Sequence, residues 1–317
     1  MEFSLRTSLF LPRRRPTIQV LPVLWKTVAT GGIIKAIILI LSFLCMGFSE
    51  IDIQPAIDRA YENGGGTVFL PVQAYYTTAP IILKNGVTLD FQGISISSID
   101  KALYGSVIVP QGHFPAFVND QTQHSHNFGV KNVSIDYGPI TGELPSSNVN
   151  DICFNFSYLY VDYSLDNIIC KNAFFSLFDV AGGWHSQVSR FWSRKSRNGI
   201  WKVNGTTVSF NSVHVEGTKD SRYDGQGWHV EKTLGVSITA SSMDNFNSIV
   251  PGYFAGNKGL SIQGFDAEFN ENYTTMWFQD NTIQAVIVGL GNKFVNKFVD
   301  GVNNTGLITE SNIMEVR

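Results

Sequence analysis

Residues able to perform acid–base chemistry are concentrated between Glu216 and Glu231. The ionisable side chains between these two carboxylates are Lys219, Asp220, Arg222, Asp224 and His229. Two carboxylates in one groove can serve as general acid and as base or nucleophile, about 5–5.5 Å apart in retaining and about 6.5–9.5 Å apart in inverting glycosidases. A lyase would instead need a base, such as a lysine, arginine or histidine of this stretch, and a group that neutralises a uronate.

Asp224 and His229 are the most specific assignments within this stretch. We expect Asp224 to act as catalytic acid or nucleophile, and His229 to act as base or sugar ligand, because histidine changes charge near neutral pH. The predicted catalytic set is completed by Asp220, Arg222 and Glu231. The alternative is a solvated loop whose charges pair with one another.

Further polar residues precede this stretch. Asp179 is expected to stack on neighbouring coils beside Lys202 and His229 as a polar ladder, in which Asp179 and Lys202 are predicted to contact substrate. Burying such charges is costly unless they are paired or have a functional role. Outward-facing, solvated side chains are therefore the alternative. His185 and Arg190 are predicted to contact substrate. The basic run that begins at Arg190 would meet an anionic sugar or offset nearby acids.

Flat aromatic faces offer stacking surfaces for sugar rings, as they do for the bases of single-stranded nucleic acids. The predicted substrate-binding aromatics are Trp201, Tyr223 and Trp228. In a stacked β architecture most aromatic side chains fill the core instead, and this is the alternative for each of the three.

The middle of the chain repeats at the length of a solenoid coil. Val188, Val208 and Val236 each precede a serine, with spacings of 20 and then 28 residues. The segments at 199–203 and 227–230 also align at a spacing of 28. A coil of this length buries its apolar face only by stacking on its neighbours. The pattern therefore predicts an all-β solenoid.

Residues 54–93 have the order of elements that opens such a solenoid. Ile53, Ala56, Ile57 and Ala60 follow helical spacing, and three glycines at 64–66 end the predicted helix at 54–62. Apolar strand-like segments follow, separated by a turn at Asn85 and Gly86.

This order resembles the N-terminal cap and first coils of the pectate-lyase-like, right-handed parallel β-helix superfamily. The resemblance implies a single-stranded right-handed parallel β-helix over residues 50–317, with a short cap helix. Phage tailspikes, polysaccharide lyases and polygalacturonase-like hydrolases share that cap, so the resemblance implies a polysaccharide substrate. Tailspike-like proteins are trimeric, which implies a homotrimer, and an extracellular or virion-surface location.

The catalytic motifs of the resembled enzymes are absent from the sequence. It has no Asn-x-Asp, Asp-Asp, Gly-His-Gly or Arg-x-Lys of polygalacturonases, and no Arg-x-Pro-x-x-Arg of pectate lyases. Our first hypothesis is a glycoside hydrolase or polysaccharide lyase acting in a groove on the β-helix. The second is a non-catalytic glycan-binding or structural β-helix, such as a tailspike or a surface adhesin.

Composition restricts the partners. The net charge of −3 is uneven: residues 1–35 hold six basic residues and one acid, leaving 17 basic and 25 acidic residues, a net of −8, in the remainder. Such an acidic body is a poor nucleic-acid binder. His113, His124, His126 and Asp136 lack metal-ligand spacing, so we expect no metal and no cofactor. Cys153 and Cys170 are expected to be buried free thiols.

The first 49 residues form a separate predicted segment. A basic leader precedes an uncharged apolar run at 36–48, within a candidate membrane anchor at 31–48. A spanning helix needs about 20 apolar residues, so the run is short for a membrane helix. A signal sequence or anchor and an unrelated N-terminal extension are the two interpretations.

Overall fold

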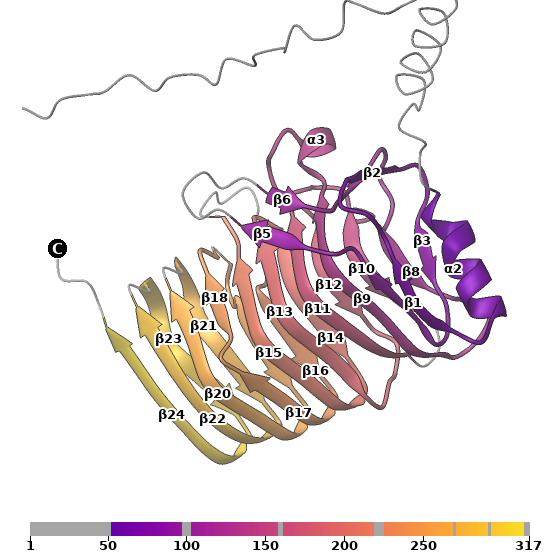
Figure 1. The fold of residues 1–317 in the computed structure, drawn as a ribbon. Coiled ribbons are helices and arrows are strands. Elements are labelled where there is room, and N and C mark those ends of the chain that lie inside the picture. The colour runs from indigo at the N-terminus through magenta and orange to yellow at the C-terminus, as the bar shows by residue number, and fades with distance from the viewer. Residues whose placement is uncertain are drawn as a thin grey trace, which may run out of the picture. The chain divides into compact units, whose positions relative to one another are not determined.

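A computed structural model describes residues 52–96, 103–157, 161–218, 225–246, 248–268, 271–290 and 293–313. They form a parallel β-solenoid whose coils stack from the N-terminal helix to the last strand (Figure 1). The predicted all-β fold is confirmed. The predicted leader and anchor at 1–49 lie outside the described residues. Within the described ranges, no helix is long and apolar enough to cross a membrane.

Two large parallel sheets carry the coils. Sheet A consists of β1 (Gly66–Phe69), β2 (Ala74–Thr77), β4 (Val87–Asp90), β7 (Val107–Pro110), β9 (Ser125–Asp136), β11 (Val161–Lys171), β13 (Ser186–Arg194), β15 (Thr206–Glu216), β17 (Leu234–Thr239), β18 (Ser242–Asp244), β20 (Lys258–Glu268), β22 (Thr282–Leu290) and β24 (Thr305–Ile313). Sheet B consists of β3 (Ile81–Leu83), β8 (Phe117–Asn119), β10 (Ile152–Phe156), β12 (Phe175–Asp179), β14 (Asn198–Val203), β16 (Trp228–Glu231), β19 (Gly252–Ala255), β21 (Glu271–Gln279) and β23 (Lys293–Val302). Two short strands, β5 (Ile94–Ile96) and β6 (Leu103–Gly105), pair antiparallel.

The predicted cap helix is present as α2 (Ile53–Glu62). The side chain of Asp52 caps its first turn by accepting a hydrogen bond from the Gln54 backbone N–H, and Ile53 and Ile57 are buried against the first coil. Gly65 is required where the chain leaves the helix, because a Cβ there would lie 2.6 Å from the Gly86 carbonyl oxygen. A second short helix, α3 (Gly138–Thr141), lies on an excursion between β9 and β10.

The long strands of sheet A bend at one residue with a left-handed backbone. In successive coils these residues are Asn132, Asn167, Arg190, Ser212, Ala240 and Gly264, with φ between 47° and 62°. Each coil therefore has three straight segments, two in sheet A and one in sheet B. The bend matters for function because it gives sheet A two outward surfaces.

An internal asparagine ladder fixes the turn from sheet B back to sheet A. Asn257 accepts hydrogen bonds from the backbone N–H and the hydroxyl of Thr233 (3.1 and 2.6 Å). Asn281 accepts from the backbone and side-chain nitrogens of Asn257 (3.0 and 2.9 Å), and Asn304 does the same for Asn281 (3.0 Å each). Each amide thus satisfies polar groups of the preceding coil.

The observed register confirms most of the predicted coil alignment. Ile200 pairs with Trp228, and Val208 pairs with Val236, both at the expected spacing of 28. The alignment of Val188 with Val208 is wrong, because Val188 pairs with Phe210. A shift of two residues keeps every side chain on the same face, so the apolar pattern could not exclude it.

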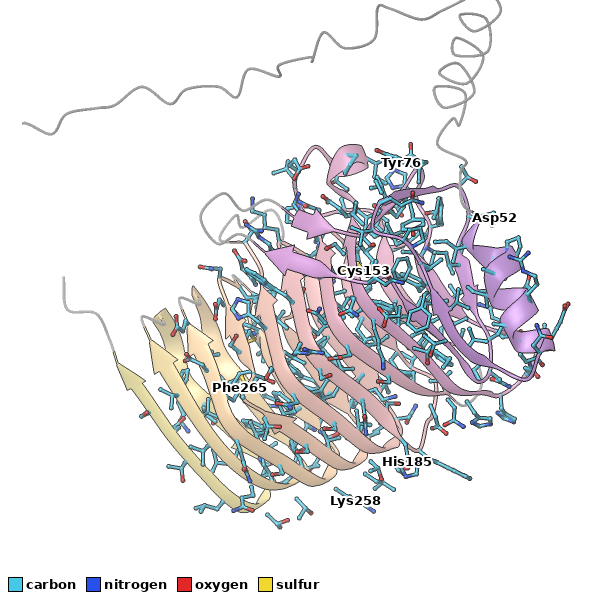
Figure 2. All side chains as sticks on the ribbon, viewed as in Figure 1. Asp52, Tyr76, Cys153, His185, Lys258 and Phe265 are labelled. Atoms are coloured by element: carbon cyan, nitrogen blue, oxygen red, sulfur yellow. A yellow bond between two sulfur atoms is a disulfide. The ribbon has the colours of Figure 1, made fainter. Side chains whose placement is uncertain are left out.

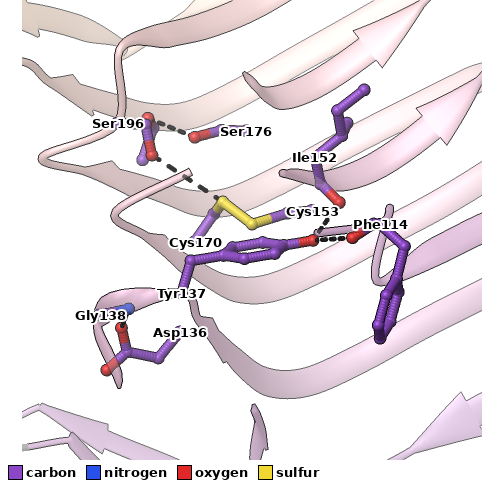
Figure 3. Close-up of a disulfide and its surroundings, with 10 residues drawn as sticks. Phe114, Asp136, Tyr137, Gly138, Ile152, Cys153, Cys170, Ser176 and Ser196 are labelled. Carbon is purple, nitrogen blue, oxygen red and sulfur yellow. Dashed lines mark hydrogen bonds between the residues drawn. A yellow bond between two sulfur atoms is a disulfide. The ribbon is translucent and has the colours of Figure 1, made fainter. Parts of the chain in front are cut away.

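The cysteines differ from the expectation of free thiols. Cys153 on β10 and Cys170 on β11 form a disulfide with Cα atoms 6.2 Å apart, and both are fully buried (Figure 3). Both side chains point into the same coil from opposite sheets, which brings the two sulfurs together. Beside the disulfide, the Tyr137 hydroxyl contacts the carbonyl oxygens of Phe114 and Ile152 at 2.7 and 2.8 Å.

Replacing a rung of the asparagine ladder should destabilise the fold. Asn281→Ala removes the acceptor for Asn257 and the donor to the Phe254 carbonyl (2.9 Å), and leaves buried polar groups unpaired. We expect the free energy of unfolding to fall by at least about 2 kcal/mol, measured by urea denaturation. The exposed Asn150→Ala is the control, for which no such loss is expected. Equal stability of both variants would show that the asparagine ladder does not stabilise the fold.

Candidate functional site

A row of aromatic side chains runs across the outer face of sheet B. The register places in one row, strand after strand, Phe178, Trp201, His229, Tyr253 and Trp277, which we call the aromatic stripe. The rings of Trp201 and His229 are stacked at 3.8 Å, and those of His229 and Tyr253 are 4.9 Å apart. The stacked faces of Trp201 and His229 cover one another, so a ligand would meet the outer edge of this row.

His229 joins the stripe to two polar neighbours. Its Nδ1 lies 3.0 Å from Gln226 Oε1, and the Gln226 amide is oriented by donating to the Val250 carbonyl at 3.1 Å. Its Nε2 lies 3.2 Å from Glu231 Oε2. Burial lowers the pKa of His229, against the opposing effect of Glu231. The structure therefore brings together His229 and Glu231, two residues of the predicted catalytic set.

Lys232 controls the charge of Glu231. Its Nζ lies 2.6 Å from Glu231 Oε1. This hydrogen bond lowers the pKa of Glu231, burial opposes it, and His229 lowers the pKa further. Glu231 is thus an ionised acceptor near neutral pH. An open hollow of about 420 Å³ lies at the start of the neighbouring strands, bordered by Asn198, Gln226, Ile249 and Tyr253 among others.

Two predicted binding residues lie inside the solenoid instead. Lys202 Nζ and the Tyr163 hydroxyl each lie 2.7 Å from Asp179 Oδ2, and Lys202 and Asp179 are fully buried. Burial raises the pKa of Asp179, although Lys202 and Tyr163 oppose it. Asp179 does stack beside Lys202 as expected, but His229 lies on the opposite face because neighbouring residues of a strand alternate. A ligand in solvent cannot reach this internal pair.

The prediction that Trp228 contacts substrate is also wrong. Its indole is fully buried between Phe210 and Phe265, at ring distances of 5.3 and 5.7 Å, and its Nε1 donates to the Ser242 carbonyl at 3.2 Å. It is a core residue, whereas its strand neighbour His229 faces outward.

His185 and Arg190 are placed away from the stripe. His185 is exposed at the edge of the solenoid where turns join the sheets (Figure 2), and Arg190 is exposed at a bend of sheet A, paired with Asp166. The remaining predicted residues, Asp220, Arg222, Tyr223 and Asp224, lie outside the described residues. Their segment connects the end of β15 to the start of β16.

A second polar cluster, which the prediction missed as a site, lies on sheet A at the start of that same connection. Glu216, Asp244 and Glu268 occupy one register row on β15, β18 and β20. The row two residues earlier contains His214, Ser242 and Asp266. We call the four carboxylates together with His214 the carboxylate patch.

The patch holds protons near neutral pH. Burial, followed by repulsion from Glu268, Asp266 and Glu216, raises the pKa of Asp244 to about 7. Burial and the neighbouring Asp266 likewise raise the pKa of Glu268 to about 7. The Asp244 side chain nevertheless keeps 17% of its surface exposed. Such shifts accompany acid–base sites, although ion-pair networks also produce them.

His214 lies beside Asp244 within the patch. Its Nε2 lies 3.5 Å from Asp244 Oδ2, and its Nδ1 hydrogen-bonds the Ser242 hydroxyl. Burial lowers the pKa of His214, against the effect of nearby Glu216 and Asp266, so the ring is neutral at neutral pH. Arg194 Nε lies 3.9 Å from Glu216 Oε2 and brings one positive charge to the edge of the patch.

A signal for the patch was present in the repeat. The spacing of 28 that aligns Val208 with Val236 also aligns Glu216 with Asp244, and a further 24 residues lead to Glu268. Applying the spacing of 28 to acidic residues as well as valines would have stacked Glu216 on Asp244, whereas the step of 24 to Glu268 needed the observed register. Among the described residues, no three histidine, cysteine or acidic side chains have an arrangement that could hold a metal ion.

Comparison with known proteins supports the fold. No protein-family model matches the chain. The mannuronan C5-epimerase AlgE4 of Azotobacter vinelandii is 34% identical over 91 residues, which are 26% of this chain and 16% of the epimerase. The tailspike gp42 of Acinetobacter phage vb_AbaP_AS12 has a TM-score of 0.56 at 13% identity, over 73% of this chain and 41% of the tailspike. The A-module of AlgE4 has a TM-score of 0.37 at 12% identity, over 83% of this chain and 95% of the module.

The stacked parallel coils agree with the comparison to the tailspike, which covers 73% of this chain. This chain therefore has the right-handed parallel β-helix fold.

Proposed function

We propose that this protein hydrolyses polysaccharides, with the carboxylate patch as its catalytic centre and the aromatic stripe as a surface that holds the glycan. The observation that carries the proposal is Asp244, a carboxyl group with a pKa near 7 stacked among three other carboxylates. A general acid must hold a proton at working pH and still release it, which a pKa near 7 allows.

The patch contains the groups that glycoside hydrolysis requires. Asp244 donates its proton to the glycosidic oxygen as the bond to the anomeric carbon breaks. A second carboxyl group, for which Glu216 is our candidate, assists water or attacks the anomeric carbon itself. His214 acts as a positioning residue, because its Nε2 faces Asp244. Asp220 and Asp224, in the segment that follows Glu216, remain proposed contributors to the same centre.

Charge favours hydrolysis over elimination. A lyase must bind a uronate and neutralise its carboxylate, which needs a basic site. The patch instead sets four carboxylates against Arg194 and a neutral His214. We therefore propose a substrate that is uncharged, or sparsely charged, around the bond that is cleaved.

The stripe supports binding of an extended chain. Its rings lie in one outward row at the spacing of the coils, and Glu231, Gln226 and Lys232 add polar groups at its border. One relative is named a mannuronan C5-epimerase, and mannuronan is a polysaccharide. Its match covers 26% of this chain. We assign Trp201 and Tyr253 to apolar contact with the sugar chain. His229 and Glu231 are proposed ligands for sugar hydroxyls.

The disulfide supports a location outside the reducing cytosol. Cys153 and Cys170 are buried and bridged, and such bonds persist in oxidising compartments. An extracellular or virion-surface protein meets polysaccharides there. A homotrimer, as the resemblance implies, stays part of the proposal.

The second candidate function is glycan binding without cleavage. The aromatic stripe favours it, because stacking alone would suffice, and so does the lack of the known catalytic motifs. Incubation with alginate, polygalacturonate, dextran and galactomannan separates the alternatives. New reducing ends without unsaturated uronate absorbance support hydrolysis, because a lyase produces both. The absorbance identifies a lyase, and binding without either product supports the second candidate.

Neutralising the proposed acid should abolish most turnover. Asp244→Asn keeps the shape of the side chain but cannot donate a carboxylic proton, so we expect the release of reducing ends to slow by roughly 10²–10⁴-fold. Asp58→Asn on α2 is the control and should retain activity. Wild-type turnover in a folded Asp244→Asn would rule out Asp244 as the acid.

The same group makes stability depend on pH. The folded-state pKa of about 7 exceeds the ordinary value of 3.8, so the stabilisation from protonated Asp244 is complete below about pH 4 and lost as pH rises through about 7. The free energy of unfolding should fall over this window by at most about 4 kcal/mol from Asp244. Urea denaturation at about pH 5 and about pH 8 should show a smaller difference for Asp244→Asn than for wild type. Identical pH dependence would contradict the shifted pKa.

A further inference from the structure

An exposed tryptophan is held rigidly at the turn between the two sheets. The backbone N–H groups of Trp184 and His185 both donate to Asp162 Oδ1, at 2.7 and 3.0 Å. The other oxygen of Asp162 lies 3.3 Å from His126 Nδ1. Burial would raise the pKa of Asp162, but these hydrogen bonds and His126 lower it, so the carboxylate is a charged anchor. The indole nevertheless remains 63% exposed.

Beside this indole lies a hollow of about 520 Å³, which we call the corner hollow. It is bordered by Trp184, Asn204, Thr206, Lys232 and Leu234, together with glycine backbone. Its volume falls in the range of small-molecule sites, about 300–1,000 Å³. The border combines a flat aromatic face and an apolar leucine with an amide, a hydroxyl and an ammonium group.

The backbone around the hollow is fixed by hydrogen bonds. The Thr206 backbone N–H donates to the Gly183 carbonyl at 2.7 Å, and the Leu234 N–H donates to the Gly205 carbonyl at 2.8 Å. Gly205 has a φ of 114°, which a residue with a side chain rarely adopts, and a Cβ there would lie 3.2 Å from Lys202. Successive coils therefore present Trp184, Thr206 and Leu234 side by side without rearrangement.

The corner hollow is separate from the proposed catalytic centre. It lies where the strands of sheet B end and the chain returns to sheet A, whereas the carboxylate patch lies where the strands of sheet A end. Lys232 connects it to the border of the stripe, since its ammonium contacts Glu231 beside His229. A polymer lying on the stripe can thus extend toward this corner.

We infer that the corner hollow is an accessory sugar-binding site, which takes one hexopyranose residue of the polysaccharide and stacks it on Trp184; this rests on the proposed function. A sugar ring has an apolar face for the indole and Leu234, and hydroxyl groups at its rim for Asn204, Thr206 and Lys232. A protein partner would favour a flat apolar patch over a concave border with polar groups on several sides.

The test uses fluorescence quenching and affinity electrophoresis of the full chain. Tryptophan fluorescence of wild type and of Trp184→Phe is quenched with acrylamide, with and without alginate, polygalacturonate, dextran or galactomannan. The difference in fluorescence between the two proteins gives the signal of Trp184. We expect a bound polymer to protect Trp184 from quenching. Trp184→Ala should weaken binding of that polymer by at least about fivefold, the lower end for one aromatic stacking contact.

Controls separate the possible causes of a change. Phe69→Ala removes another exposed aromatic, on β1, and should bind like wild type. If Trp184→Ala does not fold, as judged by circular dichroism, Leu234→Ala takes its place and should also weaken binding, because Leu234 borders the hollow and is 47% exposed. Sedimentation of Trp184→Ala should match wild type, because a changed assembly state would show that Trp184 serves a protein interface and would overturn the inference.

The remaining outcomes distinguish this site from the proposed function. A polymer that binds while Trp184 stays fully quenchable would overturn the corner site alone, and so would unchanged binding by Trp184→Ala. Protection of Trp184 without new reducing ends would support the corner site and overturn hydrolysis. If none of the four polymers binds, both proposals are wrong.

Discussion

Parallel pairing between successive coils is the interaction on which the rest of this structure depends. A single coil exposes its apolar residues and its backbone hydrogen-bonding groups, and both are satisfied only by the coils above and below it. The asparagine ladder adds side-chain hydrogen bonds to this pairing at the return turn. Register is consequently fixed coil by coil, and residues with equal positions in successive coils become neighbours in space.

This constraint turns short sequence patterns into surfaces. Trp201 and His229 are 28 residues apart in the sequence, yet their rings stack at 3.8 Å because their strands pair in register. The same rule gathers the carboxylates at the ends of three strands of sheet A. Repulsion within such a row would destabilise it if every member were ionised. Together with burial, this repulsion raises the pKa of Asp244 and of Glu268.

Alternation along a strand then decides which side chains can meet a ligand. Lys202 and Trp201 are adjacent in the sequence, but Lys202 is sealed in an internal ion pair with Asp179 while Trp201 lies on the outer face. Inside, the charge is balanced by its partner and by the Tyr163 hydroxyl. Outside, an aromatic row and polar groups stay within reach of solvent. The protein thus keeps structural charges and ligand-facing groups on opposite sides of the same strands.

The sequence by itself determined the solenoid, its cap helix and most of the coil alignment, because turn residues, apolar alternation and a spacing of 28 are local or periodic signals. It also placed His229 and Glu231 in one predicted catalytic set, and only the structure showed the contact between them. Only the tertiary structure decided that Trp228, Asp179 and Lys202 point inward, because an alternating pattern does not say which face is solvated when both hold large side chains. It likewise joined Cys153 to Cys170 and stacked Glu216 on Asp244. Such contacts depend on the register between coils, and the apolar pattern does not fix that register, because it looks the same after a shift of two residues.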